Sequence, residues 1–476
     1  MYASILIPVV IFIVLVPIDV IFQHLAFRSS GWDLGIYHQA LSQLSRFDSL
    51  NPFVSVHQQH IFNDHFDPIL LIVAPLFNLW NSAILLIVID LAMTLIGLVP
   101  ILLLLEKKLA GMVDARRGQY LRLVVVCGYL FNDFLWKALL FPSHPTQWAM
   151  AFVAWTLYYY ELKRFGWGFW ISMVLLFACK EEFPFLGVML GVALFTRKFK
   201  LEAILTIALS MLFIVFTTMF RPMFFGEVYS HSAFLKLLFI NPFEYFQKWF
   251  LTISDLRVWL PVALLTGYFV HREWRRNFDL YIILSAPLFI RLLSLYKDAF
   301  NFHYVAIFIP FILIGFIRSI GDDFRFNRIL VAQVLVIAFL SLALRPAPFH
   351  HPLNRTIGYF KNREEILLRE QIIASCKDPK LKLSAPNNWV PHLTDHDVVT
   401  MPSVWLEKGK VGSVDLWIWE SGGDYFPSKV GDAELKLKVV EAMGGEGNIS
   451  KIRFNNRIEV WRKSDVILPP VSSVTI

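Results

Sequence analysis

"MYASILIPVVIFIVLVPIDVIF" (residues 1–22) opens the chain with an apolar run that decides the class of fold. A helix needs about 20 apolar residues to cross the roughly 30 Å of hydrocarbon in a bilayer. This run is too long for a signal-peptide core, no basic residues precede it, and no small-residue cleavage site follows it. We therefore predict that it is retained as a transmembrane helix.

The composition of the whole chain agrees with a membrane protein. Hydrophobic residues make up 56% of the 476 positions, charged residues only 17%, and the mean hydropathy is +0.55. Soluble proteins carry about 25% charged residues. The net charge of +7 is typical of basic cytoplasmic loops, and no nucleic-acid-binding motif is present. The three cysteines form no CxxC or Cys/His pattern, so neither a disulfide framework nor a zinc site is indicated.

Further apolar segments of this kind predict a polytopic all-α bundle of about eleven spans. The spans are 4–26, 81–105, 118–136, 146–162, 166–179, 183–196, 201–219, 256–270, 278–294, 303–318 and 328–344. The apolar segment 67–80 is short and is broken by Pro75, so we expect a helix at the membrane interface.

Basic residues predict the orientation of the bundle. With a cytoplasmic N-terminus, five basic segments fall on the cytoplasmic side, as the positive-inside rule requires. These segments are 106–122, 161–164, 197–200, 271–276 and 318–328. The loops 27–80, 137–145, 180–182, 220–255 and 295–302 then face outward, together with the C-terminal tail. We predict a multi-pass protein of the inner (cytoplasmic) membrane.

The tail, residues 351–476, differs from the rest of the chain because it is polar and rich in turn residues. "LKLSAP", "DVVTMP" and "SVDLWIW" are typical of strands, and "AELKLKVVEAM" is typical of a helix. "KIRFNNRIEVWR" predicts a hairpin at Asn455–Asn456. We expect a small α/β domain outside the membrane, separated from a membrane domain of residues 1–345 by the Pro-rich segment 345–352.

Asp33 lies in "GWDLGIYHQ" (31–39), directly after the first span. One interpretation is a helix cap, because Ser29, Ser30 and Asp33 precede an amphipathic segment. The other is a functional loop, because 27–66 is longer than a connector needs and is rich in polar residues. The loop's candidate cavity or substrate residues are Tyr37, His38 and Gln39.

The segment "HQQHIFNDHFDP" (57–68) holds three histidines and two aspartates. Imidazole and carboxylate groups both ligate divalent metals, so His65 and Asp67, with Asp33, are the candidate ligands of Mg or Mn. The alternative is a hydrated loop, because the spacing fits no zinc-type pattern.

"CKEEFPFLGVMLG" (179–191) is the most specific motif. Lys180, Glu181 and Glu182 split an apolar stretch into two halves that are each too short to cross a bilayer. Three charges at such a hairpin tip are costly unless they face a wet cavity and pair. An ordinary charged turn is the simpler alternative.

Several other residues of the outward loops and helix ends are candidates for the same site as Lys180, Glu181 and Glu182. Arg221, Arg291 and Lys297 are candidates for phosphate binding, or they could snorkel at helix ends. His144, His303 and Tyr304 are candidate cavity residues, although histidine and tyrosine also belong to interfacial belts. Acids, bases and cations from several outward loops suit sugar transfer from a lipid phosphate, because a carboxylate can accept a hydroxyl proton and cations can stabilise the phosphate.

In order along the chain, "DLGIYHQ", "HFDPILLIVAPL", "SHPTQW", "KEEFPFLG" and "FHYVAIFIPF" make this sequence similar to an uncharacterised family of predicted membrane proteins. That family, domain-of-unknown-function family 2079, is grouped with the GT-C glycosyltransferases. The resemblance runs from about residue 30 to 318, and the tail fits as well. The chain departs from the family pattern at His38 and at Thr146–Gln147, where acids are common.

The resemblance implies a GT-C fold with an outward cavity supplied with polyprenyl-phosphate sugars. It also implies that Asp33 acts as base or metal ligand, with Glu181 and Glu182 as further acidic candidates and Lys180, Arg221, Arg291 and Lys297 at the donor phosphate. We thus predict a membrane glycosyltransferase with an extracytoplasmic acceptor. The alternatives are a transporter or flippase, and a non-catalytic scaffold of the cell envelope. The absence of an internal repeat disfavours transport.

Overall fold

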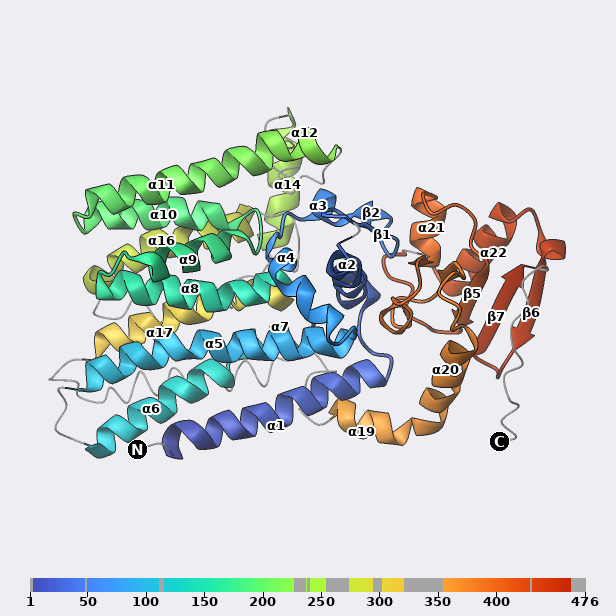
Figure 1. The fold of residues 1–476 in the computed structure, drawn as a ribbon, viewed down its shortest axis with the longest axis horizontal. Coiled ribbons are helices and arrows are strands. Elements are labelled where there is room, and N and C mark those ends of the chain that lie inside the picture. Colours follow the sequence, from blue (N-terminus) through green and yellow to red (C-terminus); the bar gives the residue numbers. More distant parts are fainter. Residues whose placement is uncertain are drawn as a thin grey trace. The chain divides into compact units, whose positions relative to one another are not determined.

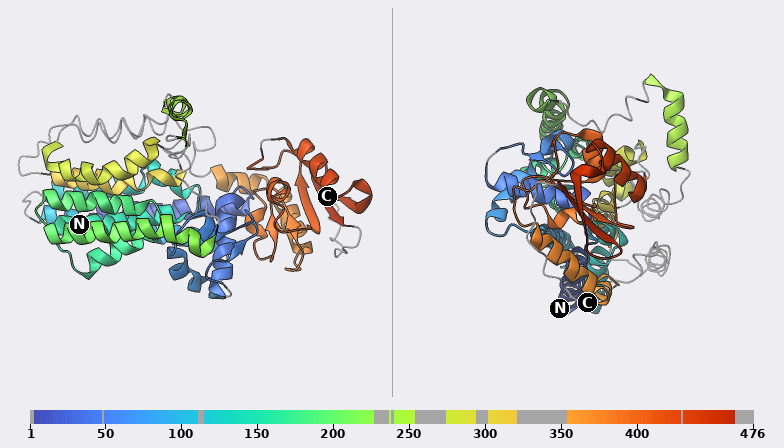
Figure 2. Two further views of the ribbon diagram at one scale, coloured as in Figure 1. Left: turned by 90° about the horizontal axis from the view of Figure 1, so that it is seen from above. Right: turned by 90° about the vertical axis from the view of Figure 1, so that its right-hand side faces the viewer.

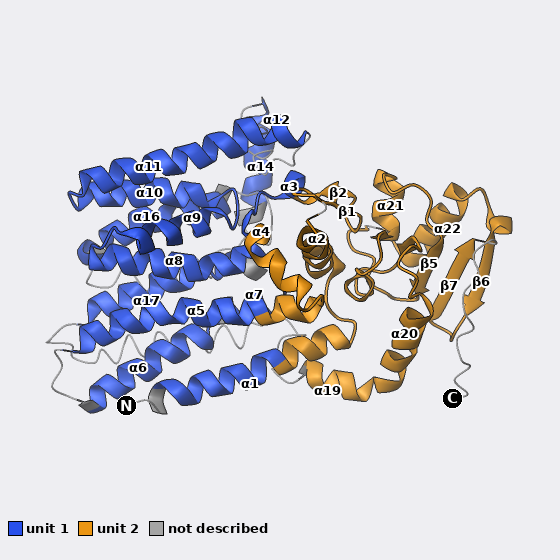
Figure 3. Ribbon diagram, in the orientation of Figure 1, with its two compact units in different colours: residues 1–17, 62–69, 89–351 blue, residues 18–61, 70–88, 352–476 orange. Residues whose placement is uncertain are grey.

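A computed structural model describes residues 3–47, 49–110, 115–226, 237, 240–253, 274–293, 302–320, 354–428 and 430–463. The described chain is mostly helical and divides into two compact units (Figure 3). Unit 1 consists of residues 1–17, 62–69 and 89–351, and unit 2 of residues 18–61, 70–88 and 352–476. Helices α1 (Ala3–Leu25) and α5 (Ala83–Leu109) each contribute to both units.

Unit 1 is a bundle of helices (Figure 1). Besides its parts of α1 and α5, its α-helices are α3 (Ile61–Asp64), α6 (Ala115–Leu130), α7 (Asp133–Leu139), α8 (Pro145–Leu162), α9 (Trp167–Phe177), α10 (Phe183–Thr196), α11 (Lys200–Val215), α12 (Arg221–Phe225), α14 (Pro242–Ile253), α16 (Trp274–Leu293) and α17 (Phe308–Ser319). Short π and 3₁₀ turns at Phe216–Phe220 and Phe302–Val305 complete it. Helix α10 lies beside α11 and α16 (Figures 1 and 2), and α8 contacts α9 and α17.

The helices occupy the apolar segments that the sequence marks as spans. The spans 256–270 and 328–344 lie outside the described residues, and every other predicted span contains a helix. Among the described helices, three are long and apolar enough to cross a membrane on their own: Ile5–Leu25, Ala83–Leu109 and Lys200–Phe225. The total of eleven spans therefore stays a prediction.

The predicted broken hairpin is present. Helices α9 and α10 contain 11 and 14 residues, which at 1.5 Å per residue correspond to about 17 and 21 Å. Residues 178–182 join them, and the Ile69 amide donates to the Ala178 carbonyl (2.9 Å). Because both helices are shorter than a full crossing, the charged tip belongs at the end of unit 1 where the outward loops were predicted.

The opposite ends of these helices hold a second polar cluster. The Arg318 guanidinium donates to Asp279 (2.8 Å) and also pairs with Glu161, while Arg197 reaches Asp279 at 2.6 Å. Glu161, Arg197 and Arg318 come from three of the basic segments that the sequence assigned to one side. The structure thus brings these segments together at one end of unit 1.

The C-terminal part of unit 2 is built on a five-stranded sheet of order β4-β3-β5-β7-β6. Its elements are α19 (Asn354–Lys361), α20 (Arg363–Ser375), β3 (Leu383–Ser384), a 3₁₀ turn (Val390–His392), β4 (Val399–Thr400), α21 (Pro402–Lys408), β5 (Leu416–Glu420), α22 (Asp432–Ala442), a 3₁₀ turn (Glu446–Asn448), β6 (Ile449–Arg453) and β7 (Ile458–Lys463). Strand β3 runs parallel to β4 and β5, and β7 runs antiparallel to β5 and β6.

The strands and α22 overlap the segments predicted from the tail, whereas helices α19, α20 and α21 were not predicted. The β6–β7 hairpin turns at Asn455–Asn456, and the Asn455 side chain accepts from the Ile458 amide at 2.7 Å. Trp417, Trp419 and Trp461 form the core between the sheet and α22. The tail is therefore the α/β structure that its sequence pattern indicates.

Residues from the loop that was predicted to be the first outer loop belong to the same compact unit. They form a π-turn (Gly31–Gly35), α2 (Ile36–Ser45), β1 (Phe53–Val54), β2 (Gln59–His60), α4 (Ile69–Val73) and a 3₁₀ turn (Ala74–Asn78), with Ile69 itself in unit 1. Unit 2 is thus more than the predicted domain of residues 351–476. The predicted boundary at 345–352 lies outside the described residues, and the two-domain division stays a prediction.

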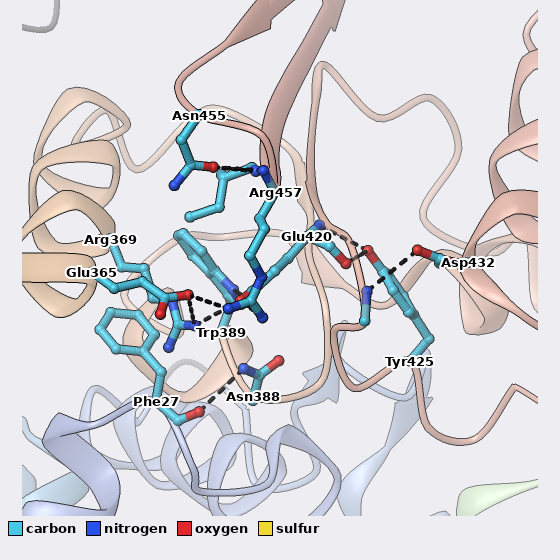
Figure 4. A network of polar contacts seen from close by, with 12 residues as sticks. Phe27, Glu365, Arg369, Asn388, Trp389, Glu420, Tyr425, Asp432, Asn455 and Arg457 are labelled. Carbon is cyan, nitrogen blue, oxygen red and sulfur yellow. Dashed lines mark hydrogen bonds and ion pairs between the residues drawn. The ribbon is translucent and has the colours of Figure 1, made fainter. Parts of the chain in front are cut away.

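A buried ion network holds α20 to the sheet (Figure 4). The Glu420 side chain is 2% exposed, and its carboxylate accepts from Arg369 (2.6 Å) and from the Trp389 indole (2.7 Å). Arg457 reaches Glu365 at 3.0 Å and Glu420 at 3.4 Å. Removing one partner of such a buried pair leaves an uncompensated charge, so the network fixes the position of α20.

Candidate functional site

The candidate site lies in unit 1, at the tip between α9 and α10. Glu181 accepts two hydrogen bonds from the loop that precedes α4: one from the His65 ring (3.2 Å) and one from the Phe66 amide (2.9 Å). Both carboxylate oxygens are used, one in each bond. The chain folds this way because a half-buried carboxylate needs several donors.

The neighbouring acid takes a different partner. Glu182 forms an ion pair with Arg291, which lies in the last turn of α16. The Arg291 guanidinium also lies over the Tyr304 ring, 4.5 Å from its centroid. Its Nε is buried and has no hydrogen-bond partner in the described part of the chain. Arg291 therefore retains donor capacity beside an aromatic ring.

Lys180 is the second cation at this ring. Its side chain is 3% exposed, and its Nζ lies 5.2 Å from the Tyr304 centroid. Among the residues that the structure describes, none accepts a hydrogen bond from this ammonium or forms an ion pair with it. A buried ammonium without a counter-charge is unfavourable, so an anion bound here would stabilise Lys180.

Two histidines border the charged groups. The His65 and His144 rings lie 5.6 Å apart at 71°, and the His144 ring lies 6.5 Å from that of Tyr304. Burial and Lys180 lower the pKa of His65, whereas Asp64 and Glu181 raise it, and the net pKa is above the usual value. His144 caps α8 by accepting from Thr146 (3.2 Å to its amide). His144 therefore has a structural role at the start of α8, besides lying beside His65 and Tyr304.

Arg221 reaches the same loop but contacts its backbone. It donates to the carbonyls of Phe62 (2.8 Å) and Asp64 (2.9 Å). These bonds hold the loop that carries His65. Arg221 thus has a structural task, and its predicted contact with phosphate stays a prediction.

The other predicted residues fall elsewhere. Asp33 lies in the π-turn of unit 2, where the Ser30 hydroxyl caps by accepting from the Trp32 amide (3.2 Å). His38 bonds Thr394 and Asn81, and Gln39 donates to Ser55 (2.8 Å); Tyr37 is buried beside them on α2. These contacts are internal to unit 2. Lys297 and the side chain of His303 lie outside what the structure describes.

The donor set for a metal is incomplete in the described part of the chain. No three His, Cys, Asp or Glu side chains come together there as ligands. Asp67 is fully buried, and the His65 ring is engaged by Glu181. The divalent metal therefore stays a prediction.

One buried acid near the site was not predicted from the sequence. Asp90, in α5, accepts from the Trp148 indole (2.7 Å) and the Ser143 hydroxyl (2.8 Å), which fixes the segment before α8 next to His144. The available signal was an aspartate inside the apolar run "LLIVIDLAM", because intramembrane acids need partners. The structure thus adds a positioning residue to the site.

Fold and site together define a helical membrane protein with a charged site around the Tyr304 ring at one end of its bundle. Residues 23–438 match the family described as "Predicted membrane protein (DUF2079)", and the chain belongs to that family. No curated protein matches the chain in sequence. A crystal structure of ArnT from Cupriavidus metallidurans bound to undecaprenyl phosphate is similar, with a TM-score of 0.52 and 11% identity over 99% of this chain and 100% of that chain. At this identity the similarity concerns the fold.

Proposed function

We propose that this chain is a membrane glycosyltransferase of GT-C type that transfers a sugar from a polyprenyl-phosphate donor to an extracytoplasmic acceptor. The observation that carries the proposal is the pair of buried cations, Lys180 and Arg291, on the Tyr304 ring. A phosphate would supply the missing counter-charge, and charge-assisted hydrogen bonds are strongest with such anions. The undecaprenyl phosphate bound to the structurally similar ArnT supports a lipid-linked phosphate.

The reaction requires a base, an attacking hydroxyl and a stabilised leaving group. Asp33, the base that the family resemblance implies, takes the proton of the acceptor hydroxyl; it belongs to unit 2, whereas Lys180 and Arg291 belong to unit 1. The hydroxyl oxygen bonds to the anomeric carbon while the bond from that carbon to the phosphate oxygen breaks, with inversion at the carbon. The electron pair leaves with the polyprenyl phosphate, whose growing charge Lys180 and Arg291 stabilise. Glu182 holds Arg291, and Glu181 holds His65, so these acids position the site.

The binding step can be tested with purified full-length protein in nanodiscs. Undecaprenyl phosphate is titrated and its affinity measured by native mass spectrometry. We expect Lys180→Gln to weaken binding by about tenfold or more, because a hydrogen bond to a charged group contributes about 1.5–3 kcal/mol. Lys200→Gln is the matched control, since Lys200 is exposed at the start of α11.

The transfer step needs its own assay, with a labelled polyprenyl-phosphate sugar and membrane extracts as acceptor source. Loss of label transfer in Asp33→Asn, with donor binding retained, is the expected result.

Equal donor affinity in the wild type and Lys180→Gln would refute the donor site. Ion-coupled uptake by proteoliposomes, without transfer, would favour the transporter or flippase. Binding of an envelope partner that survives loss of the outward acids and histidines would favour the scaffold.

A further inference from the structure

Unit 2 contains a pocket that the proposed donor site does not use. Its cavity has a volume of about 350 Å³. This lies within the range of about 300–1,000 Å³ that is usual for small-molecule sites. Three segments line it: one face of α2, the residues around the β1–β2 hairpin, and residues 394–397. All three belong to unit 2.

The first wall is a polar face of α2. Gln39, Ser42, Gln43 and Arg46 follow one another at intervals of three, one and three residues, and this spacing places them on the same side of a helix. Gln39 is held by its bond to Ser55 (2.8 Å). The Gln39 amide is buried and is used by Ser55, Val56 and His396, so the groups that this face presents to the pocket are the Gln43 amide and the Arg46 guanidinium.

The second wall is aromatic. Phe53 and His60 are directly opposite one another in the β1–β2 pair, and their rings lie 5.4 Å apart at 77°. The His60 ring bonds the Asn51 carbonyl (2.7 Å), which fixes its orientation. Phe53 is half-buried, so an apolar ring surface remains for the non-polar face of a ligand.

The third wall is acidic. Asp395 and Asp397 are exposed, and between them His396 is 7% exposed. The His396 Nδ1 is buried without a hydrogen-bond partner in the described part of the chain. Burial lowers the pKa of this histidine, so its ring is neutral. A buried polar atom without a partner indicates that a ligand or water completes its hydrogen bonding.

The charge of the lining argues against a phosphate. Two carboxylates and one guanidinium line the pocket, and the buried His396 is neutral at neutral pH, so the lining has no excess of positive charge. Carboxylates accept hydrogen bonds from the hydroxyl groups of a ligand, and amide and guanidinium groups donate hydrogen bonds to hydroxyl oxygens. A ring-shaped ligand with many hydroxyls and one apolar face matches all three walls.

We propose that this pocket binds a short uncharged saccharide. If the proposed function holds, this saccharide is the end of the acceptor glycan. The role as acceptor rests on the proposed function, whereas saccharide binding by the pocket does not. The pocket selects against charged phosphates through Asp395 and Asp397. It orients the sugar ring on Phe53 and fixes its hydroxyls along α2.

The test measures saccharide binding to the full-length protein in nanodiscs by saturation-transfer difference NMR. The probes are glucose, galactose, mannose, N-acetylglucosamine and their disaccharides, with inorganic phosphate for comparison. We expect at least one saccharide to bind, and Phe53→Ala and Asp397→Asn each to weaken it by about tenfold. Glu434→Gln, an exposed acid on α22 outside the pocket, is the matched control and should bind as the wild type does.

Each other outcome overturns the proposal. These outcomes are binding of no saccharide, equal binding by both pocket variants and the wild type, and preference for phosphate. Thermal melting of each variant separates a lost contact from a lost fold. Lys180→Gln should keep saccharide binding, so a failure of the donor site and a failure of this pocket give different results.

Discussion

Glu181 and Glu182 are neighbours in the chain, yet they bind opposite sides of the candidate site. Glu181 binds the loop that carries His65, and Glu182 binds Arg291 on α16. Because consecutive residues of a turn point in different directions, one short segment can hold two other elements. The result leaves Lys180, the third charge of the tip, without an acid among the described residues.

The first prediction concerns the charge of His65. Glu181→Gln removes a carboxylate that raises the pKa of His65, whereas burial and Lys180, which lower it, remain. We therefore expect the pKa of His65 to fall and the ring to lose its proton at a lower pH than in the wild type. Titration of ¹⁵N-labelled histidine by NMR measures the change.

The neighbouring acid provides the control for this prediction. Glu182→Gln leaves both bonds of Glu181 in place, so the pKa of His65 should change less than in Glu181→Gln. Equal shifts in the two variants would mean that the charge of the whole tip, rather than the hydrogen bond, governs His65.

Among the helices, the contact between α10 and α11 depends on small residues. Gly187 and Gly191 lie four residues apart, on one face of α10, a spacing that lets membrane helices approach closely. A Cβ at Gly191 would lie 2.4 Å from Ile207 and 3.1 Å from the Ala203 carbonyl of α11.

We expect Gly191→Ala to destabilise the protein by about 1–3 kcal/mol, because overpacking forces the two helices apart. The measurement is the apparent melting temperature in detergent. Gly128→Ala is the control, since Gly128 also lies inside a helix and a Cβ there would meet Leu313 at 3.5 Å, an ordinary contact distance. If Gly191→Ala has the same melting temperature as Gly128→Ala, the two helices adjust without cost and the close contact is unimportant.

Hydropathy predicts the positions of the helices well, but it predicts the residues at which they begin and end less well. Helix α10 begins and ends where the apolar segment 183–196 does. In contrast, the predicted span 118–136 is two helices, because Asn132 caps α7 by accepting from the Phe134 amide (2.8 Å). A single capping residue is averaged away in an apolar window, although "FNDF" contains the signal.

At the scale of the whole molecule, the sequence could predict which candidate residues lie on the same side of the membrane, but not which of them contact one another. The positive-inside rule placed His65, His144 and Lys180 on one face, and the structure brings them to one end of unit 1, beside Tyr304. Which acid pairs with which base depends on the geometry of the loops. Loops lack the periodic pattern of apolar residues from which helices and strands are predicted. The grouping of 18–61 and 70–88 with the tail depends on contacts between distant segments, so no local pattern reveals it.

Orientation in the membrane gives the third prediction. Lys200→Cys, at the exposed start of α11, and Glu434→Cys, on the exposed face of α22, should be labelled from opposite sides. A membrane-impermeant maleimide should reach the second in intact spheroplasts and the first only after permeabilisation. The native Cys179 and Cys376 are buried, and the wild type gives the background from all three cysteines. Labelling of both positions in intact spheroplasts would contradict the predicted topology.

The last prediction is that unit 2 loses stability in mild acid because it buries neutral histidines. Burial lowers the pKa of His392 to about 4 from 6.5, and it also lowers the pKa of His38 and His396. The unfolded chain then binds more protons, so their stabilising contribution is complete above about pH 6.5 and falls toward pH 4, by about 3 kcal/mol for His392. The melting temperature should therefore fall from pH 7.5 to pH 5, and less steeply in His392→Gln. The exposed His60→Gln should follow the wild type, and an equal slope in all three proteins would exclude His392 as a source of acid sensitivity.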